Sequence, residues 1–289
     1  MKNEETIIQE EQHDEERALY HLTDARVRMC TFGGPADGES ALKEIRNVDV
    51  EDCSFLLRYP FWHASRFSVH ACLMAQDCRA PFWYSENGEI TESSIQAVKA
   101  VRECNHLTFS HCDIRSEEFG WKSSYIRFSD GTLTSMYPFL DSSHVTLRNI
   151  SMKAKYAFQY MNDLTIEQCS LDTKDAFWHS RNVVVRDTMI KGEYIGWYSD
   201  GLTLINCKII GTQPFCYCRN LRLINCEMEE TDLAFEYSDV TAQIRGHIES
   251  VKNPRHGVIV ADSIGEIIRS DSVMECDCEI VINDSEAGL

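Results

Sequence analysis

The chain has 289 residues, of which 46 are Asp or Glu and 28 are Lys or Arg, so its formal net charge at pH 7 is −18. Such a charge repels phosphate backbones and acidic membrane surfaces, which argues against nucleic acid and membranes as partners. No apolar run is long enough to span a membrane, and the first residues lack a basic start followed by an apolar core. We therefore expect a cytoplasmic protein.

Residues 1–45 are expected to form an N-terminal tail and a cap. The first residues are dense in charge, which is typical of a loosely ordered segment. Val27, Met29 and Thr31 follow with the period of a strand, and Ser40 to Ile45 form a short helical piece in this prediction. A repeat protein needs such a cap, because its first coil would otherwise expose an apolar end.

A 19-residue repeat dominates the chain from Val48 onward. It is clearest where Leu202, Leu204, Cys207 and Ile209 recur as Leu221, Leu223, Cys226 and Met228. Stepping both ways from Leu202 gives eleven anchor residues, and all steps between them have this same length except the longer one from Phe67 to Gly88. The anchors are Val48, Phe67, Gly88, Leu107, Ile126, Val145, Leu164, Val183, Leu202, Leu221 and Val240. Such a period over most of a chain indicates a solenoid of stacked coils.

Each repeat contains three short apolar patterns separated by turn residues. The anchor and the residue two positions later are apolar, as in Leu164 and Ile166, which is the period of a β-strand. A second inward pair follows at the fifth and seventh positions after the anchor, and a third run begins at about the twelfth. Asn, Asp or Gly precedes seven of the eleven anchors, and these residues suit a left-handed corner.

Three strands and three corners per coil predict an all-β chain that forms a single parallel β-helix. We expect about eleven coils over residues 46–245 and a C-terminal cap over residues 246–289. The stretch from Ser94 to Cys104 is an exception, because Ile95, Val98 and Val101 have helical spacing. Cysteines at the second inward pair are expected to be buried and reduced; they are Cys53, Cys72, Cys112, Cys169, Cys207 and Cys226.

Seven strings in the chain carry a resemblance to a known family. They are KAVREC (99–104), YAFQY (156–160), DTKDAFWHS (172–180), GEYIGWYS (192–199), GTQPFCYCRNLRLINC (211–226), DLAFEYS (232–238) and VKNPRHGVIVADSIGEII (251–268). They resemble an uncharacterised bacterial family, number 3737 among the domains of unknown function, over roughly residues 20–270. The resemblance implies a right-handed, pectin-lyase-like β-helix and no established activity.

Aromatic residues gather on the third run of the coils. One column holds all five tryptophans, Trp62, Trp83, Trp121, Trp178 and Trp197. The position before it holds Phe61, Phe82, Phe139, Phe158, Phe177 and Phe215, and the position after it reads His63, Tyr84, Glu103, Lys122, Asp141, Tyr160, His179, Tyr198, Tyr217 and Glu236. The last column must face water. Strict alternation would then expose the Phe column as well, whereas a local bulge would bury both other columns, and the pattern leaves these alternatives open.

We predict that this face binds a neutral carbohydrate or another small ligand. The predicted ligand-binding residues are Phe158, Tyr160, Phe177, His179, Tyr198, Phe215 and Tyr217. Side chains that repeat at the inter-strand spacing of about 4.8 Å would present a row of aromatic faces to successive sugar rings. The negative net charge favours a neutral ligand.

The candidate catalytic residues are Glu103, Asp141 and His179. Glu103 and Asp141 lie two coils apart with Lys122 between them, which puts their backbones roughly 9 to 10 Å apart. This spacing suits the paired carboxylates of an inverting glycoside hydrolase, and it suits an ion-pair ladder at least as well. The alternatives to a binding protein are therefore a carbohydrate-active enzyme of hydrolase or lyase type and a ligand-free interaction scaffold.

Cofactor and metal sites are not indicated. The chain has no phosphate-cradling glycine loop. Cys216-Tyr217-Cys218 and Cys276-Asp277-Cys278 have one residue between the cysteines and no partner pair, so they do not predict a zinc site. An Asp-Asp pair and a Gly-His-Gly element, which pectinase-like enzymes would carry, are both missing.

Overall fold

The computed structural model describes residues 6–283 and shows an all-β chain. These residues form a parallel β-solenoid of about 15 turns with roughly 19-residue spacing, as the repeat predicts. The one helix among them is the single-turn 3-10 helix η1 (Gln76–Cys78), which takes up the extra length of the step from Phe67 to Gly88. The chain divides into two compact units, residues 1–146 and 147–289, and strand β19 (Ser143–Lys153) crosses this boundary in the sequence.

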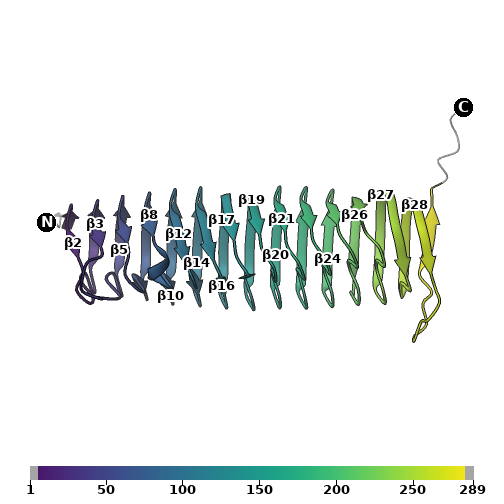
Figure 1. The fold of residues 1–289 in the computed structure, drawn as a ribbon, viewed down its shortest axis with the longest axis horizontal. Helices are drawn as coiled ribbons and strands as arrows, with labels where there is room; N and C mark the ends of the chain where they lie inside the picture. Colours follow the sequence, from purple (N-terminus) through teal and green to yellow (C-terminus); the bar gives the residue numbers. More distant parts are fainter. Residues whose placement is uncertain (1–5, 284–289) are drawn as a thin grey trace, which may run out of the picture. The chain divides into compact units, whose positions relative to one another are not determined.

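The first unit contains three stacks of parallel strands, one for each side of a coil (Figure 1). The first stack is β1 (Thr6–Gln9), β3 (Thr23–Arg28), β5 (Arg46–Glu51), β8 (Ser65–His70), β11 (Glu86–Thr91), β14 (Asn105–Ser110) and β17 (Ser124–Thr134). The second is β2 (Gln12–His13), β4 (Thr31–Phe32), β6 (Ser54–Phe55), β9 (Leu73–Met74), β12 (Ser94–Ala97), β15 (Asp113–Ser116) and again the long β17. The third is β7 (Phe61–Trp62), β10 (Phe82–Trp83), β13 (Val101–Arg102), β16 (Glu118–Trp121) and β18 (Tyr137–Pro138).

The second unit has two stacks of strands (Figure 1). One is β20 (Asn162–Glu167), β22 (Arg181–Arg186), β24 (Asp200–Ile205), β26 (Leu221–Glu229), β27 (Asp239–Lys252), β28 (His256–Ile268) and β29 (Glu279–Ile282). The other is β21 (Ser170–Asp172), β23 (Met189–Lys191), β25 (Lys208–Ile210) and again β26. The third side of a coil is not a strand here but a turn, at residues 157–160, 176–179, 195–198 and 214–217.

Several sequence predictions need correction. Residues 6–45, expected as tail and cap, contain β1 to β4 and therefore add coils, and β27 to β29 extend the stack beyond residue 245. The coil count accordingly exceeds eleven. The segment from Ser40 to Ile45 forms a turn instead of a helix, and Ser94 to Cys104 contains β12 and β13, because Ile95 and Ala97 alternate inward and pair with the next coil.

The core consists of the inward residues of each coil, stacked in register as the pattern predicts. In the second unit Leu164 pairs with Val183 and Val183 with Leu202, and all three side chains are buried. In the first unit Gly88 occupies an anchor position next to Phe67. A Cβ on Gly88 would lie 2.4 Å from the Phe67 Cζ, so the glycine makes room for the larger ring of the neighbouring coil.

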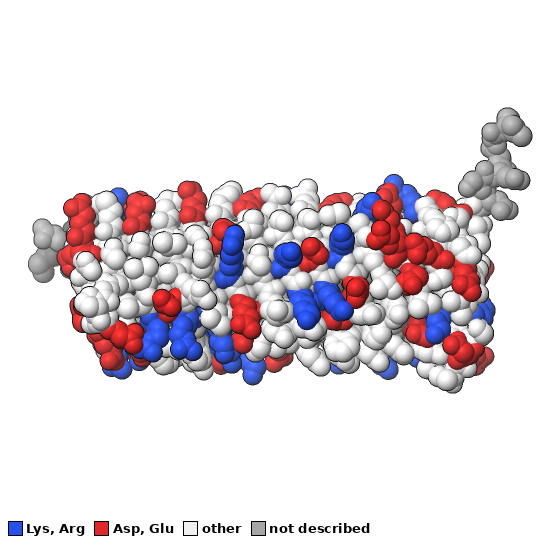
Figure 2. All heavy atoms as spheres, viewed as in Figure 1, with Lys and Arg blue, Asp and Glu red and all other residues white. Residues whose placement is uncertain are grey.

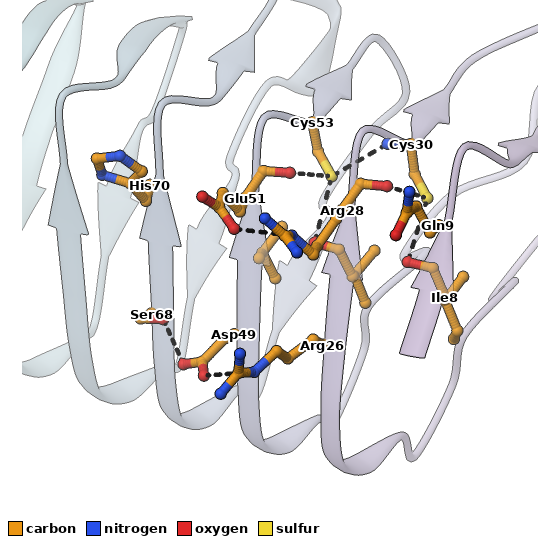
Figure 3. Close-up of polar contacts among 12 residues, drawn as sticks. Ile8, Gln9, Arg26, Arg28, Cys30, Asp49, Glu51, Cys53, Ser68 and His70 are labelled. Carbon is orange, nitrogen blue, oxygen red and sulfur yellow. Dashed lines mark hydrogen bonds and ion pairs between the residues drawn. The ribbon is translucent and has the colours of Figure 1, made fainter. Parts of the chain in front are cut away.

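The corners are held by hydrogen bonds from small buried side chains (Figure 3). The Cys53 thiol lies 3.2 Å from the Glu51 carbonyl oxygen, to which it donates, and its sulfur accepts the Cys30 N–H at 3.4 Å. On the outer surface next to this corner, the Arg28 Nε lies 2.9 Å from a Glu51 carboxylate oxygen in the adjacent strand. The thiols therefore satisfy backbone groups at the corner, while charged residues pair across the outer face.

Candidate functional site

The third side of each coil in the second unit points its aromatic residues in three different ways. Phe177 is fully buried, Trp178 is half-buried and His179 is exposed. In the coil of Phe215, Cys216 and Tyr217, the first two residues are buried and Tyr217 is half-buried. Phe177 and His179 both have left-handed backbones, with φ of 63° and 52°. Strict alternation fails because these residues form a turn and not an extended strand.

Phe158, Phe177 and Phe215 therefore cannot contact a ligand, and this part of the predicted binding set is wrong. Each has a relative exposure of 0%. The Phe158 and Phe177 rings stack inside the coil with centroids 5.2 Å apart. Gly196 stands at the equivalent position of the next coil with φ of 80°, and a Cβ there would lie 2.8 Å from the Phe215 Cδ1. This column is core packing.

The polar column forms a continuous row of rings on the surface of the second unit, which we call the aromatic ladder. Its members are Tyr160, His179, Tyr198, Tyr217 and Tyr237. The successive ring centroids are 5.2, 5.0, 4.8 and 5.7 Å apart. The first three ring pairs are within 8° of parallel, while the last pair is tilted by 40°. The structure thus brings together four of the predicted ligand-binding residues and adds Tyr237.

Tyr237, not Glu236, ends the ladder, because the coil between Tyr217 and Tyr237 contains one extra residue. The Tyr198 N–H donates to the carbonyl of Cys216, the residue just before Tyr217. The Tyr217 N–H donates to the carbonyl of Glu236, the residue just before Tyr237, so the second of these steps is one residue longer than the first. Glu236 instead forms an ion pair with Lys252, with 3.0 Å between the charged atoms, which raises the pKa of the lysine.

The ladder forms one wall of a groove with a volume of about 640 Å³. A second row of lining residues, which we call the polar wall, lies at or just before the start of the neighbouring strands and consists chiefly of Arg181, Asp200 and Arg219. The remaining lining residues are Met161, Asn162, Cys218, Arg255 and Met274. The Tyr237 hydroxyl accepts a hydrogen bond from the Val273 N–H at 3.2 Å, so the segment that carries Met274 is tied to the end of the ladder.

The stacked rings present their edges, and not their faces, to this groove. Each inner ring of the ladder has a neighbour on both faces, which leaves the ring edges, with their phenol hydroxyls and imidazole nitrogens, available to a ligand. Burial, with a contribution from the charge of Glu236, raises the pKa of the Tyr217 phenol, which keeps it a neutral hydrogen-bond donor. The groove can therefore offer a line of donors and acceptors with aromatic edges between them.

Glu103 and Asp141 lie in the first unit, and the geometry around them does not form a catalytic pair. Both occupy left-handed corners with Lys122 between them, as predicted. The Glu103 carboxylate lies 3.4 Å from the Arg102 Nε in its own coil, and neither Lys122 nor Asp141 has an ion pair among the described residues. The predicted ion-pair ladder is thus replaced by a local pair, and His179, the third candidate, belongs to the aromatic ladder of the second unit.

The first unit carries two shorter rows of stacked rings, of which the sequence analysis missed the second. His63 and Tyr84 stack at 5.1 Å, and His106, Tyr125 and His144 stack at 4.5 Å per step. The second row occupies the corner before the anchor, where the repeat reads Asn or Asp in other coils. The missed signal was the recurrence of ring-bearing side chains at that corner in successive repeats.

The family is shown by comparison with family models. The model described as "Protein of unknown function (DUF3737)" matches residues 6–281. The chain belongs to this family. No curated protein sequence matches the chain.

Two solved structures show a distant likeness to this member of the DUF3737 family. One is the periplasmic alginate epimerase AlgG, at 11% identity, 90% coverage of this chain, 78% of that chain and a TM-score of 0.28. The other is the A-module of the Azotobacter vinelandii mannuronan C-5 epimerase AlgE6, at 8% identity, 94% coverage of this chain, 87% of that chain and a TM-score of 0.27. Likenesses this weak add nothing to a functional conclusion.

The described part of the chain contains neither a metal cluster nor a membrane-spanning helix. Within residues 6–283, no three His, Cys, Asp or Glu side chains are placed to hold a metal ion. In the same range no helix has the length and apolar character needed to cross a membrane. All thirteen cysteines carry free thiols, and the six of the second inward pair are buried, as predicted.

Proposed function

We propose that the groove of the second unit binds a carbohydrate along the aromatic ladder. The observation that carries this proposal is that the row of rings from Tyr160 to Tyr237 lines the same groove as the polar residues Arg181, Asp200 and Arg219. Ligand sites of this size combine aromatic surface with a few convergent polar groups, and the groove has both. A sugar chain carries hydroxyl groups at regular intervals, which matches a wall whose donors and acceptors repeat with every coil.

The binding mode differs from stacking on ring faces. Because neighbouring rings cover the inner faces, the hydroxyls of Tyr198 and Tyr217 and the nitrogens of His179 would hydrogen-bond to sugar hydroxyls. Tyr160, at one end, is 54% exposed and supplies the largest apolar contact. Asp200 is the one carboxylate among the described lining residues, and it accepts a hydrogen bond from Asn220 at 2.7 Å. A single engaged carboxylate favours binding over paired-carboxylate hydrolysis.

The proposal predicts that replacing both Tyr160 and Tyr198 by Ala weakens glycan binding by at least about tenfold, since aromatic anchors usually carry much of a binding energy. The loss of fold stability should be moderate, because the two substitutions remove three stacked pairs that each contribute about 0.5 to 1.5 kcal/mol beyond their buried area. A glycan array identifies a ligand, and calorimetry then measures wild type and variant.

Tyr125→Ala is the matched control. Tyr125 is 46% exposed and stacks between His106 and His144 in the first unit, outside the groove. It should lose similar stability and keep full binding. If no glycan binds the wild-type protein, or if the double variant binds as wild type does, the proposal is wrong and an interaction scaffold remains.

A further inference from the structure

Two arginines on the polar wall of the groove have free guanidinium groups. Arg181 pairs in register with Asp200, and Asp200 forms a bridge with Arg219, so the three residues stand in one column on successive coils. The side chains of Arg181 and Arg219 make no ion pair and no hydrogen bond within residues 6–283, and both are exposed. In a column of Arg, Asp and Arg on successive coils, ion pairs between the aspartate and its two neighbours would ordinarily be expected.

Asp200 forms no ion pair with either arginine, and its described side-chain hydrogen bond is to Asn220. The Asn220 side-chain amide donates to it at 2.7 Å, and no guanidinium nitrogen of Arg181 or Arg219 comes within ion-pairing distance. By contrast, Arg255, the third arginine of the groove, forms a two-pronged pair with Asp239, in which Nε lies 2.7 Å from the carboxylate. The groove therefore contains one satisfied arginine and two with all donors available.

The local charge of the groove is opposite to that of the chain. Its described lining residues include three arginines and one aspartate; Arg255 is paired with Asp239, which leaves two unpaired arginines and one aspartate, whereas the whole chain carries a formal charge of −18. Free guanidinium groups on such an acidic protein attract anions at close range, and their fork of N–H donors matches a carboxylate. Because the strands are about 4.8 Å apart, Arg181 and Arg219 repeat at roughly 10 Å along the groove.

We infer that the carbohydrate bound in this groove is acidic, with carboxylate groups on sugar units that lie opposite Arg181 and Arg219. This inference rests on the proposed function and replaces the neutral ligand expected from net charge. Asp200, between the two arginines, accepts a hydrogen bond from a hydroxyl of the intervening sugar. The ligand therefore presents a carboxylate to Arg181, a hydroxyl to Asp200 and a second carboxylate to Arg219. The aromatic ladder contacts the opposite edge of the same sugars.

The test compares two tetrasaccharides that differ only in the group at C6 of each sugar, a hydroxymethyl in one and a carboxylate in the other. Cellotetraose and a β-1,4-linked tetraglucuronate share ring and linkage, and only the second carries carboxylates. We expect the wild-type protein to bind the tetraglucuronate at least about tenfold more tightly in calorimetry, since charge-assisted hydrogen bonds are roughly twice as strong as neutral ones. The difference should shrink as ionic strength rises, because salt screens exposed charges.

The double variant R181Q/R219Q should bind the tetraglucuronate at least about tenfold more weakly than wild type and bind cellotetraose unchanged. The matched control is R186Q/R222Q, which alters net charge equally at two exposed arginines outside the groove. It should bind both probes as wild type does. Equal losses in the two double variants would show that only net charge matters and would overturn the inference.

The two proposals fail in distinguishable ways. If cellotetraose binds as tightly as the tetraglucuronate and both signals vanish in the Tyr160 and Tyr198 double variant, the groove binds carbohydrate but the inferred acidity is wrong. If a glycan array and calorimetry show no binding of any saccharide, neutral or acidic, the proposed function itself is wrong and the inference falls with it.

Discussion

At the residue scale, the columns of the repeat were predictable but the direction of each side chain on the third side was not. Phe177, Trp178 and His179 follow one another in the chain, and alternation would expose the first and third alike. The left-handed backbone at Phe177 and at His179 turns the phenylalanine inward and leaves the histidine in water. Left-handed conformations are uncommon at large residues, so sequence patterns rarely predict them.

The buried cysteines show a second limit of prediction from residue types alone. The pattern predicts their burial correctly, but their function at the corner depends on hydrogen bonding as well as on size. The Cys72 thiol donates to the His70 carbonyl at 3.2 Å, and its sulfur accepts the Cys53 N–H at 3.3 Å. Ser93 and Thr188 occupy the same position in other coils and accept the equivalent N–H groups with their hydroxyls.

Cys72 allows the two interpretations of this column to be separated. If hydrogen bonding matters, Cys72→Ser should cost little, whereas Cys72→Val should destabilise by about 1 to 3 kcal/mol, because the buried Cys53 N–H would lose its acceptor. If Cys72 acts only as a small apolar side chain, the order should be reversed, so that the valine variant is tolerated and the serine variant loses stability. Urea unfolding of the two variants decides, and a more stable valine variant would contradict the corner hydrogen bond.

Two of the buried thiols are also held firmly in the neutral form. A hydrogen bond with Cys53, together with burial, raises the pKa of the Cys72 thiol, and burial raises the pKa of Cys104 to about 12. A neutral thiol is a poor nucleophile, so we expect these two cysteines to have a structural role.

At the element scale, the inter-coil register was predicted well because it rests on a strict period. The structure pairs Leu164 with Val183, which is the common step of the repeat, and Phe67 with Gly88, which is its one longer step. The third side was predicted as a strand throughout. It is a strand in the first unit and a turn in the second, because left-handed residues such as Phe158 and Tyr160 break the extended backbone there.

The coil that ends in Tyr237 contains its extra residue at an identifiable place. The Gly211 N–H donates to the carbonyl of Glu229, and the Gln213 N–H donates to that of Asp232, so two positions in one coil face three in the next. The insertion therefore lies between Glu229 and Asp232. Thr231 is fully buried there, whereas Glu230 is exposed with a φ of 54°, so Glu230 is the residue that bulges outward.

This coil predicts a contrast between two single-residue deletions. Removing Glu230 should restore the common step at a surface corner and leave the fold intact, with a modest loss of stability. Removing Thr165 in the middle of β20 should unfold the second unit, because a slip of one residue would turn Ile166 and the inward residues after it toward water. Circular dichroism melts of the two deletion variants measure this, and equal stabilities would contradict the strand register.

At the scale of the whole chain, both ends of the repeat were missed because the step changes there. Ala25 pairs with Val48, which is a longer step than the common one, and Val240 pairs with Gly257, which is a shorter one. A search that advances by a constant step therefore stops at Val48 and Val240 although the strand pairing continues. Backbone hydrogen bonds between coils need matching strands but not equal corners, so corners of different length are tolerated.

Charge is the other property that belongs to the whole chain. The formal charge of −18 leaves many carboxylates without a basic partner, and acidic side chains gather over β26 to β28 in the second unit (Figure 2). Exposed ion pairs such as Lys208 with Glu229 offset part of this repulsion, but pairs of this kind contribute only about 0 to 1 kcal/mol each. Repulsion among the excess carboxylates should therefore exceed the attraction within the pairs.

This balance predicts the sign of the salt effect on stability. Raising NaCl from about 10 to roughly 200 mM shortens the Debye length from about 30 to less than about 10 Å, which screens the long-range repulsion more than it weakens close pairs. The melting temperature should rise by about 2 °C or more, corresponding to ~1 kcal/mol for a protein of this size. Calorimetric scans at constant pH measure the shift. A falling melting temperature would mean that the surface ion pairs, and not the excess acidic charge, dominate the electrostatics of the folded chain.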